Sequence, residues 1–155
     1  MTDSLRAQGE QIVRGALRAV LPDEAVRRAL KDARFPGRVF LVAAGKAAWQ
    51  MASVAREALP AIAGGVVVTK YGHVKGEIDG VACYEGGHPV PDENSLRGTR
   101  AALALTGHLR ADDTVLFLLS GGGSALFEQP LLPLAELQDI TSQLLAAGAD
   151  IVEIN

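Results

Sequence analysis

Apolar residues along the chain fall into short continuous runs that alternate with stretches of helical spacing. The continuous runs, rich in Val, Leu and Ala, are typical of strands buried on both faces of a parallel sheet. They occupy residues 39–44, 65–69 and 115–119, and residues 81–85 predict a further short strand. Helical spacing predicts helices over residues 4–20, 22–32, 47–59, 95–109 and 133–147, with Gly148 as the C-terminal cap of the last one.

Strands that alternate with helices predict an α/β fold, with a Rossmann-like, mostly parallel sheet that carries helices on both faces and is preceded by N-terminal helices. In such sheets, ligands bind beyond the carboxyl ends of the strands. Polar or glycine-rich segments directly follow the four strands at residues 45–46, 70–73, 86–95 and 120–124. We therefore expect these segments to gather along one rim of the sheet.

Three consecutive glycines flanked by two serines follow the run 115–119. They are Ser120, Gly121, Gly122, Gly123 and Ser124. Backbone without a Cβ can turn tightly and bring its N–H groups close to a ligand, and a helix opening at Ser124 would add the positive end of its dipole. This pattern is typical of an anion site, most often for phosphate. A tight strand-to-helix connection that binds nothing is the alternative.

Gly45 and Lys46 follow the run 39–44, so the Lys46 ammonium is expected to project over the same rim. There it can neutralise phosphate as a compact charge. If it is desolvated, its pKa falls and it can act as a base. A surface lysine that packs on the sheet edge is a third interpretation, and the nearby glycine loop favours phosphate binding.

His88 lies in a loop stiffened by prolines and followed by Asp92, Glu93, Asn94 and Ser95. Asp92, Asn94 or Ser95 can each cap the next helix. Beside a phosphate site, the same loop could hold a divalent cation or a hydroxylated substrate. The sequence does not assign metal ligands.

Charge and composition exclude several classes of protein. The net charge is −3 without a basic stripe, which gives no reason to expect nucleic acid as a partner. A single cysteine, Cys83, excludes an internal disulfide and suits a reducing compartment. No apolar run reaches the ~18 residues that cross a membrane, and residues 1–4 do not resemble a signal peptide. We therefore expect a cytoplasmic protein without a membrane partner.

Two nucleotide-binding signatures are absent. A Walker A motif would need Gly and Ser or Thr where the chain has Phe40 and Ala47. A dinucleotide fingerprint that starts at Gly121 would need Gly or Ala at Leu126, and one that starts at Gly45 would need Gly at Ala47. Their absence argues against a nicotinamide enzyme.

Four segments together resemble the glycerate 2-kinase family. They are residues 44–47, 70–73, 85–95 and 120–126, and they occur in the family's order. The resemblance runs from about residue 5 to the end of the chain. It implies transfer of phosphate from ATP to D-glycerate, a Rossmann-like N-terminal domain and a cleft that holds ATP and Mg²⁺. It also implies that Lys46 is important for catalysis.

Family chains continue beyond a segment resembling residues 153–155 into a second domain that closes the cleft. We therefore expect residues 1–155 to be a single N-terminal kinase domain, truncated before the C-terminal domain and weakly active or inactive alone. Its exposed apolar surface is expected to favour a homo-oligomer. In this hypothesis Lys46 is catalytic, Gly45 and residues 120–124 bind phosphate, and Lys70, His88 and residues 92–95 contact substrate or nucleotide. The alternatives are an NAD(P)-dependent hydroxypyruvate reductase and a non-catalytic sugar-phosphate binding module.

Overall fold

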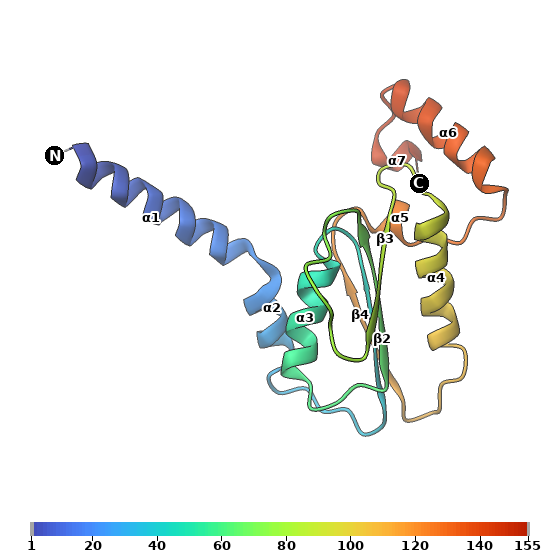
Figure 1. Cartoon of the computed structure of the whole chain (residues 1–155), viewed down its shortest axis with the longest axis horizontal. Coiled ribbons are helices and arrows are strands. Elements are labelled where there is room, and N and C mark those ends of the chain that lie inside the picture. Colours follow the sequence, from blue (N-terminus) through green and yellow to red (C-terminus); the bar gives the residue numbers. More distant parts are fainter. Residues whose placement is uncertain (1, 155) are drawn as a thin grey trace.

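Four parallel strands form one sheet in the order β3-β2-β1-β4. The structure is a computed structural model and describes residues 2–154. The central strand β1 (Val39–Ala44) pairs with β2 (Gly64–Lys70) and β4 (Thr114–Leu119), while β2 also pairs with β3 (Val81–Gly86). The predicted strands agree with these bounds to within a residue, and the predicted α/β fold with a parallel sheet is confirmed (Figure 1).

The predicted helices are present with small shifts at their ends. They are α1 (Thr2–Val20), α2 (Pro22–Leu30), α3 (Ala48–Ala58), α4 (Glu93–Leu105) and α6 (Leu134–Ala146). Two single-turn helices are added, α5 (Gly123–Leu126) and α7 (Ile151–Ile154). Gly148 follows α6 with a φ of +77° and caps it as predicted. None of the described helices is long and apolar enough to cross a membrane.

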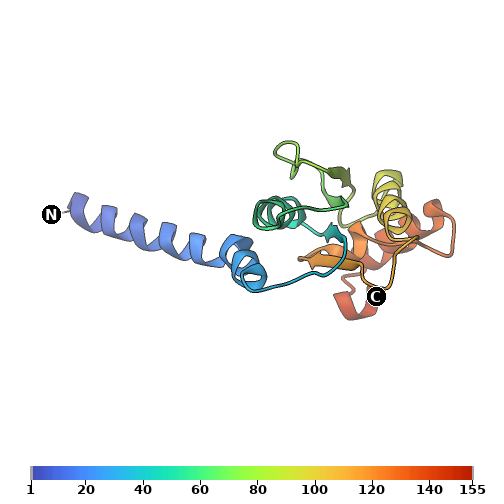
Figure 2. The ribbon, with the colours of Figure 1, turned by 90° about the horizontal axis from the view of Figure 1, so that it is seen from below.

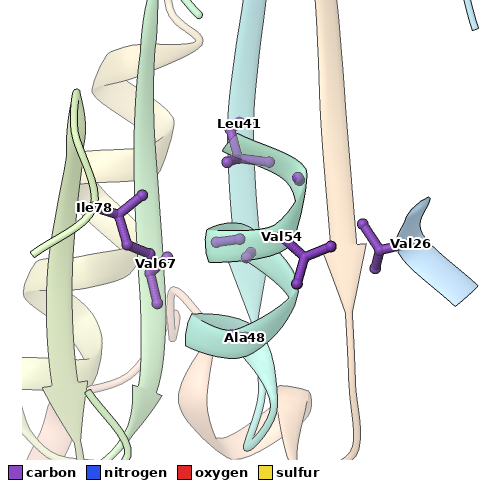
Figure 3. Packing of buried hydrophobic residues seen from close by; sticks show 9 residues of the cluster. Val26, Leu41, Ala48, Val54, Val67 and Ile78 are labelled. Carbon is purple, nitrogen blue, oxygen red and sulfur yellow. The ribbon is translucent and has the colours of Figure 1, made fainter. Parts of the chain in front are cut away.

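The core lies on both faces of the two central strands. On one face, Leu41 and Val67 pack with residues of α3 (Figure 3). On the other, Val42 and Val68 pack with Ala102 of α4. Alternate residues of a strand point to opposite faces, so helices on both faces explain why the apolar runs are continuous. Each fully buried Val or Leu side chain contributes about 1.5–3 kcal/mol to folding.

Helix α1 projects away from the sheet (Figures 1 and 2). The amphipathic pattern predicted for it is present, but its apolar side is exposed to solvent. The exposed fractions are 58% to 79% for Leu5, Ile12, Val13, Leu17 and Val20. The apolar side of α1 is therefore not covered by the other described elements.

Strand β4 is less buried than its sequence predicts. Phe117 is 46% exposed and Leu119 is 60% exposed, whereas every residue of β1 is buried. The reason is topological, because β4 lies at the edge of the sheet and pairs only with β1 among the described strands. The prediction that the run 115–119 is buried on both faces is therefore wrong for the described structure.

The order of strands along the sheet reverses between β1 and β4. The chain runs from β1 through β2 to β3 in one direction, and α4 then returns it to the far side of β1. In open parallel sheets, the crevice at such a reversal lies beyond the carboxyl ends of the two strands. The segments 45–46 and 120–124 follow these two strands, so the topology brings them together.

Candidate functional site

The loop after β1 and the loop after β4 are joined by hydrogen bonds. The backbone N–H of Lys46 donates to the carbonyl oxygen of Gly121 at 2.9 Å. The hydroxyl of Ser120 accepts from the backbone N–H of Ala47 at 3.0 Å and lies 3.3 Å from the carbonyl oxygen of Ala44, to which it donates. The Ser120 hydroxyl is therefore engaged in holding the two loops together.

Two glycines allow this close approach. Gly45 has a φ of +108°, and a Cβ there would overlap the carbonyl and hydroxyl oxygens of Ser120. Gly122 has a φ of +84°, and a Cβ there would lie 2.7 Å from Nε2 of His88 and 3.0 Å from Cε of Lys46. The His88 ring and the Lys46 side chain therefore flank the backbone of Gly122. Both glycines adopt a conformation that residues with a Cβ rarely take.

These side chains line a cavity of about 380 Å³ at the carboxyl edge of the sheet. Four of the predicted site residues contribute to it, namely Lys46, His88, Gly122 and Ser124. They come from three loops that lie far apart in the sequence. The predicted convergence of these loops at one rim is thus present in the structure.

The polar end of the cavity carries positive charge. Burial lowers the pKa of His88 below its ordinary value, and the positive charges of Lys46 and Lys70 lower it further. The neutral form of His88 is therefore favoured at pH 7. Neutral imidazole retains an unprotonated nitrogen that can accept a proton. Lys70 ends β2 and acts on His88 through its charge, although it does not line the cavity.

The backbone of Lys46 is also fixed from the neighbouring loop. Nδ1 of His73 lies 2.7 Å from the carbonyl oxygen of Lys46, and the Thr69 hydroxyl donates to the same oxygen at 3.5 Å. The segment 70–73 thus reaches the rim as predicted, and His73 contacts the backbone rather than the cavity.

The sequence allowed Asp92, Asn94 or Ser95 to be the N-cap of α4, and the structure shows that it is Asp92. Its Oδ1 accepts from the backbone N–H of Ser95 at 3.0 Å, and the hydroxyl of Ser95 accepts from the N–H of Asp92 at 2.9 Å. Tyr71 donates its hydroxyl to Asp92 at 2.7 Å, and the Asn94 amide donates to Tyr71 at 2.7 Å. Burial raises the pKa of Asp92, but hydrogen bonds from Tyr71, Ser95 and Gly87 outweigh it and lower that pKa. These groups stabilise the loop that carries His88.

Glu93 is not among the groups that bond in the capping network. It forms an ion pair with Arg100 at 3.2 Å, and both side chains are exposed. Within residues 2–154, no group of three or more His, Cys, Asp or Glu side chains is placed to hold a metal ion. The cavity itself contains one carboxylate, that of Glu128. Mg²⁺ in nucleotide sites is commonly held by one or two carboxylates together with phosphate and water, so these residues do not form a dedicated metal cage.

The far wall of the cavity comes from residues that the sequence analysis did not single out. Leu137, Thr141 and Leu145 line it at four-residue spacing along α6, and α7 adds Ile151 and Ile154. Because residues four apart share one face of a helix, this spacing predicts that the three side chains face the same way. It resembles ordinary core packing, however, so it does not point to a cavity.

Glu128, which follows α5, is the other residue missed. Its side chain is half-buried, and burial raises the pKa of its carboxyl group. A single glutamate after a short helix carries no recognisable sequence signal. Its position in the cavity depends on how α5 and α6 fold over the rim.

Comparisons with known proteins bear on the family and the fold of the chain. A family model described as "Domain of unknown function (DUF4147)" matches residues 8–155. A protein named D-glycerate 2-kinase from Thermotoga maritima is 54% identical over 99% of this chain, and one named glycerate 2-kinase from Pyrococcus horikoshii is 40% identical over 97% of it. A crystal structure of a glycerate kinase from Thermotoga maritima superposes with a TM-score of 0.85 at 53% identity, over 98% of this chain.

The chain spans 37% of the length of each of these three relatives. The matched part includes the glycine loop, the Lys46 loop and the His88 loop, because nearly the whole chain is covered. The chain therefore belongs to the DUF4147 family, and it is similar to part of proteins that are named glycerate 2-kinases.

Proposed function

We propose that the chain forms the phosphate-binding part of a glycerate 2-kinase, which transfers the γ-phosphate of ATP to D-glycerate. The observation that carries the proposal is the position of Gly122 between Lys46 and His88 in one cavity. A cation, an uncharged base and a glycine backbone beside one another suit a phosphoryl group. The names of the relatives support the same activity.

In this proposal, phosphate oxygens accept hydrogen bonds from the backbone N–H groups of Gly122, Gly123 and Ser124 and from the Lys46 ammonium. Phosphoryl transfer depends mainly on positioning and on neutralising charge. Lys46 is suited to this role because its backbone is fixed from two sides while its side chain reaches the cavity. Ser120 and Gly45 support the site by holding the two loops together.

The chemical step is a displacement at the γ-phosphorus. A hydroxyl oxygen of glycerate forms the new P–O bond, and the bond from the γ-phosphorus to the β–γ bridging oxygen breaks, which leaves ADP with the bonding electron pair. Neutral His88 accepts the proton that the hydroxyl loses. Lys70 attracts the carboxylate of glycerate through its charge. Magnesium that accompanies ATP would be held mainly by phosphate and water and would neutralise phosphate charge.

The residues of the α4 cap take an indirect part. Oδ1 of Asp92 and the hydroxyl of Ser95 are engaged in the capping box, while Oδ2 of Asp92 accepts from the Tyr71 hydroxyl. The Asn94 amide also donates to Tyr71. We therefore propose that these groups position the His88 loop, while Asn94 retains one amide donor for a substrate oxygen. Glu93 pairs with Arg100 and has no assigned role.

We also propose that segments such as the relatives possess beyond the matched region complete the enzyme. They would close the open side of the cavity and cover the exposed side of β4. A chain of 155 residues alone is then expected to bind phosphate compounds and to show weak or no turnover.

A fusion tests this function. This chain is joined to the part of the Thermotoga maritima relative that it does not cover, and phosphorylation of D-glycerate by ATP is measured. We expect turnover in the fusion, and a loss of several powers of ten when it carries Lys46→Met. Reduction of hydroxypyruvate with NADH or NADPH in place of kinase activity would contradict the proposal. Thermal stabilisation by sugar phosphates but not by nucleotides would favour a binding module.

A further inference from the structure

The cavity lining has two chemically different parts. Lys46, His88 and Ser124 come from the loops beyond the strands, while Leu145, Ile151 and other aliphatic side chains come from α6 and α7. D-Glycerate carries an oxygen on each of its three carbons and offers little apolar surface. The apolar wall therefore does not match glycerate, and it suits a less polar part of a ligand.

Helix α6 is not used as core in the described structure. It has no buried residue, and Gln138 ties it to the His88 loop by donating to the carbonyl oxygen of Pro91 at 2.9 Å. The face with Leu137, Thr141 and Leu145 is directed to the cavity. The helix thus serves as a wall whose apolar face remains available to a ligand.

Glu128 is the acidic group on this side. It is half-buried, and none of the described residues gives it a hydrogen bond or an ion pair, which explains why burial alone shifts its pKa upward. The carboxylate is partly shielded from water and its oxygens are free to accept hydrogen bonds, so it suits a ligand that brings hydroxyl donors. Gly122 and Glu128 lie at opposite ends of α5, whose four residues rise about 6 Å. A ligand spanning both would carry phosphate at one end and hydroxyl groups at the other.

We propose that the α6–α7 wall and Glu128 bind the nucleoside part of the phosphate donor. The flat base lies against Leu137, Leu145 and Ile151, and the ribose hydroxyls donate to the carboxylate of Glu128. A cavity of about 380 Å³ is large enough for more than a three-carbon acid and falls in the usual size range of small-molecule sites. The inference rests on the proposed function, since it extends the phosphate site toward the rest of a nucleotide.

The test separates the two parts of the cavity lining with three probes. Calorimetry on the 155-residue chain measures binding of ATP, tripolyphosphate and adenosine, with a chelator present. Glu128→Gln is expected to weaken ATP and adenosine about tenfold, as for loss of hydrogen bonds to a charged group, and to leave tripolyphosphate unchanged. Leu145→Asp is expected to give the same pattern. Lys46→Met is expected to weaken ATP and tripolyphosphate but not adenosine.

Glu136→Gln is the matched control, because Glu136 is exposed on α6 and does not line the cavity. It should change none of the affinities. If Glu128→Gln and Leu145→Asp leave ATP binding unchanged while tripolyphosphate still binds, the nucleoside site is wrong and the phosphate site stands. An effect of Glu128→Gln that requires added Mg²⁺ would make Glu128 a metal ligand and also overturn the inference. Binding of none of the three probes would contradict the proposed function itself.

Discussion

Lys46 and Gly121 follow different strands of the sheet, and a backbone hydrogen bond of 2.9 Å joins them. This bond places the lysine loop and the glycine loop at the reversal of strand order, where open parallel sheets bind ligands. The Lys46 side chain then runs beside Gly122 toward His88. Binding of phosphate at this point is the central feature of the proposed function.

Lys46→Met is expected to reduce the affinity of the chain for tripolyphosphate about tenfold to a hundredfold, because one charged hydrogen bond is lost. The unfolding transition should change little, since Lys46 is exposed. Calorimetric titration measures the affinity. Lys75→Met, which removes an exposed lysine that does not line the cavity, is the control and should bind like the original chain. If both variants lost the same affinity for tripolyphosphate, Lys46 would contribute only through the overall charge of the chain and not through a specific contact.

Gly122→Ala is expected to lower the free energy of unfolding by about 1–2 kcal/mol, because an alanine is strained in the left-handed conformation of this position. The close contact of the new Cβ with the His88 ring should lower it further. The same substitution should displace Lys46 and abolish tripolyphosphate binding. Gly121→Ala is the matched control, because its φ is not positive and a Cβ there meets no atom within 4 Å. Chemical denaturation and calorimetry compare the two. Tight binding by Gly122→Ala would show that the loop geometry is not required.

The affinity for tripolyphosphate is expected to rise as the pH falls below 7. Burial and two nearby lysines lower the pKa of His88 in the free chain, and a bound anion raises it because imidazolium attracts the anion. Binding therefore takes up a proton, and the added affinity is present below the pKa of His88 in the complex and lost above it. Titrations at several pH values measure this.

His88→Gln is the control for this prediction, because protonation of the ligand affects both proteins equally. The difference in affinity between the two chains should grow toward low pH. If the affinities of the two chains changed with pH in the same way, His88 would not interact with the bound anion.

The loops of the site were easier to predict than its far wall. The polar segments after β1, β2, β3 and β4 could be placed at one rim because parallel strands share a carboxyl edge. The position of Lys46 beside Gly122 follows from that topology. Glu128 and the α6 wall could not be placed, since they depend on how α6 packs over the rim, and no periodicity encodes that packing.

The capping network shows a second limit of sequence reasoning. Asp92, Asn94 and Ser95 each have the chemistry of a cap and of a ligand contact. Only the geometry shows that Asp92 and Ser95 form the capping box and that Tyr71 bridges Asp92 and Asn94. The edge position of β4 was missed for a similar reason. An apolar run predicts a strand, but it does not show which neighbouring strand or helix packs against it.

The exposed side of β4 predicts self-association of the 155-residue chain. Phe117 and Leu119 are exposed there, and the ring of Phe117 lies 5.5 Å from that of Phe127. Exposed apolar patches commonly mark interaction surfaces. Leu119→Lys is expected to shift the chain toward monomer in sedimentation experiments. Leu103→Lys is the control, because Leu103 is 53% exposed on α4, away from this edge. A strictly monomeric original chain would contradict this prediction.

The position of a bound triphosphate tests the central claim most directly. A crystal structure of the chain with a non-hydrolysable ATP analogue should place a phosphate within hydrogen-bond distance of the backbone N–H groups of Gly122 and Gly123 and of the Lys46 ammonium. A phosphate bound elsewhere on the chain, with this loop and Lys46 unoccupied, would contradict the account.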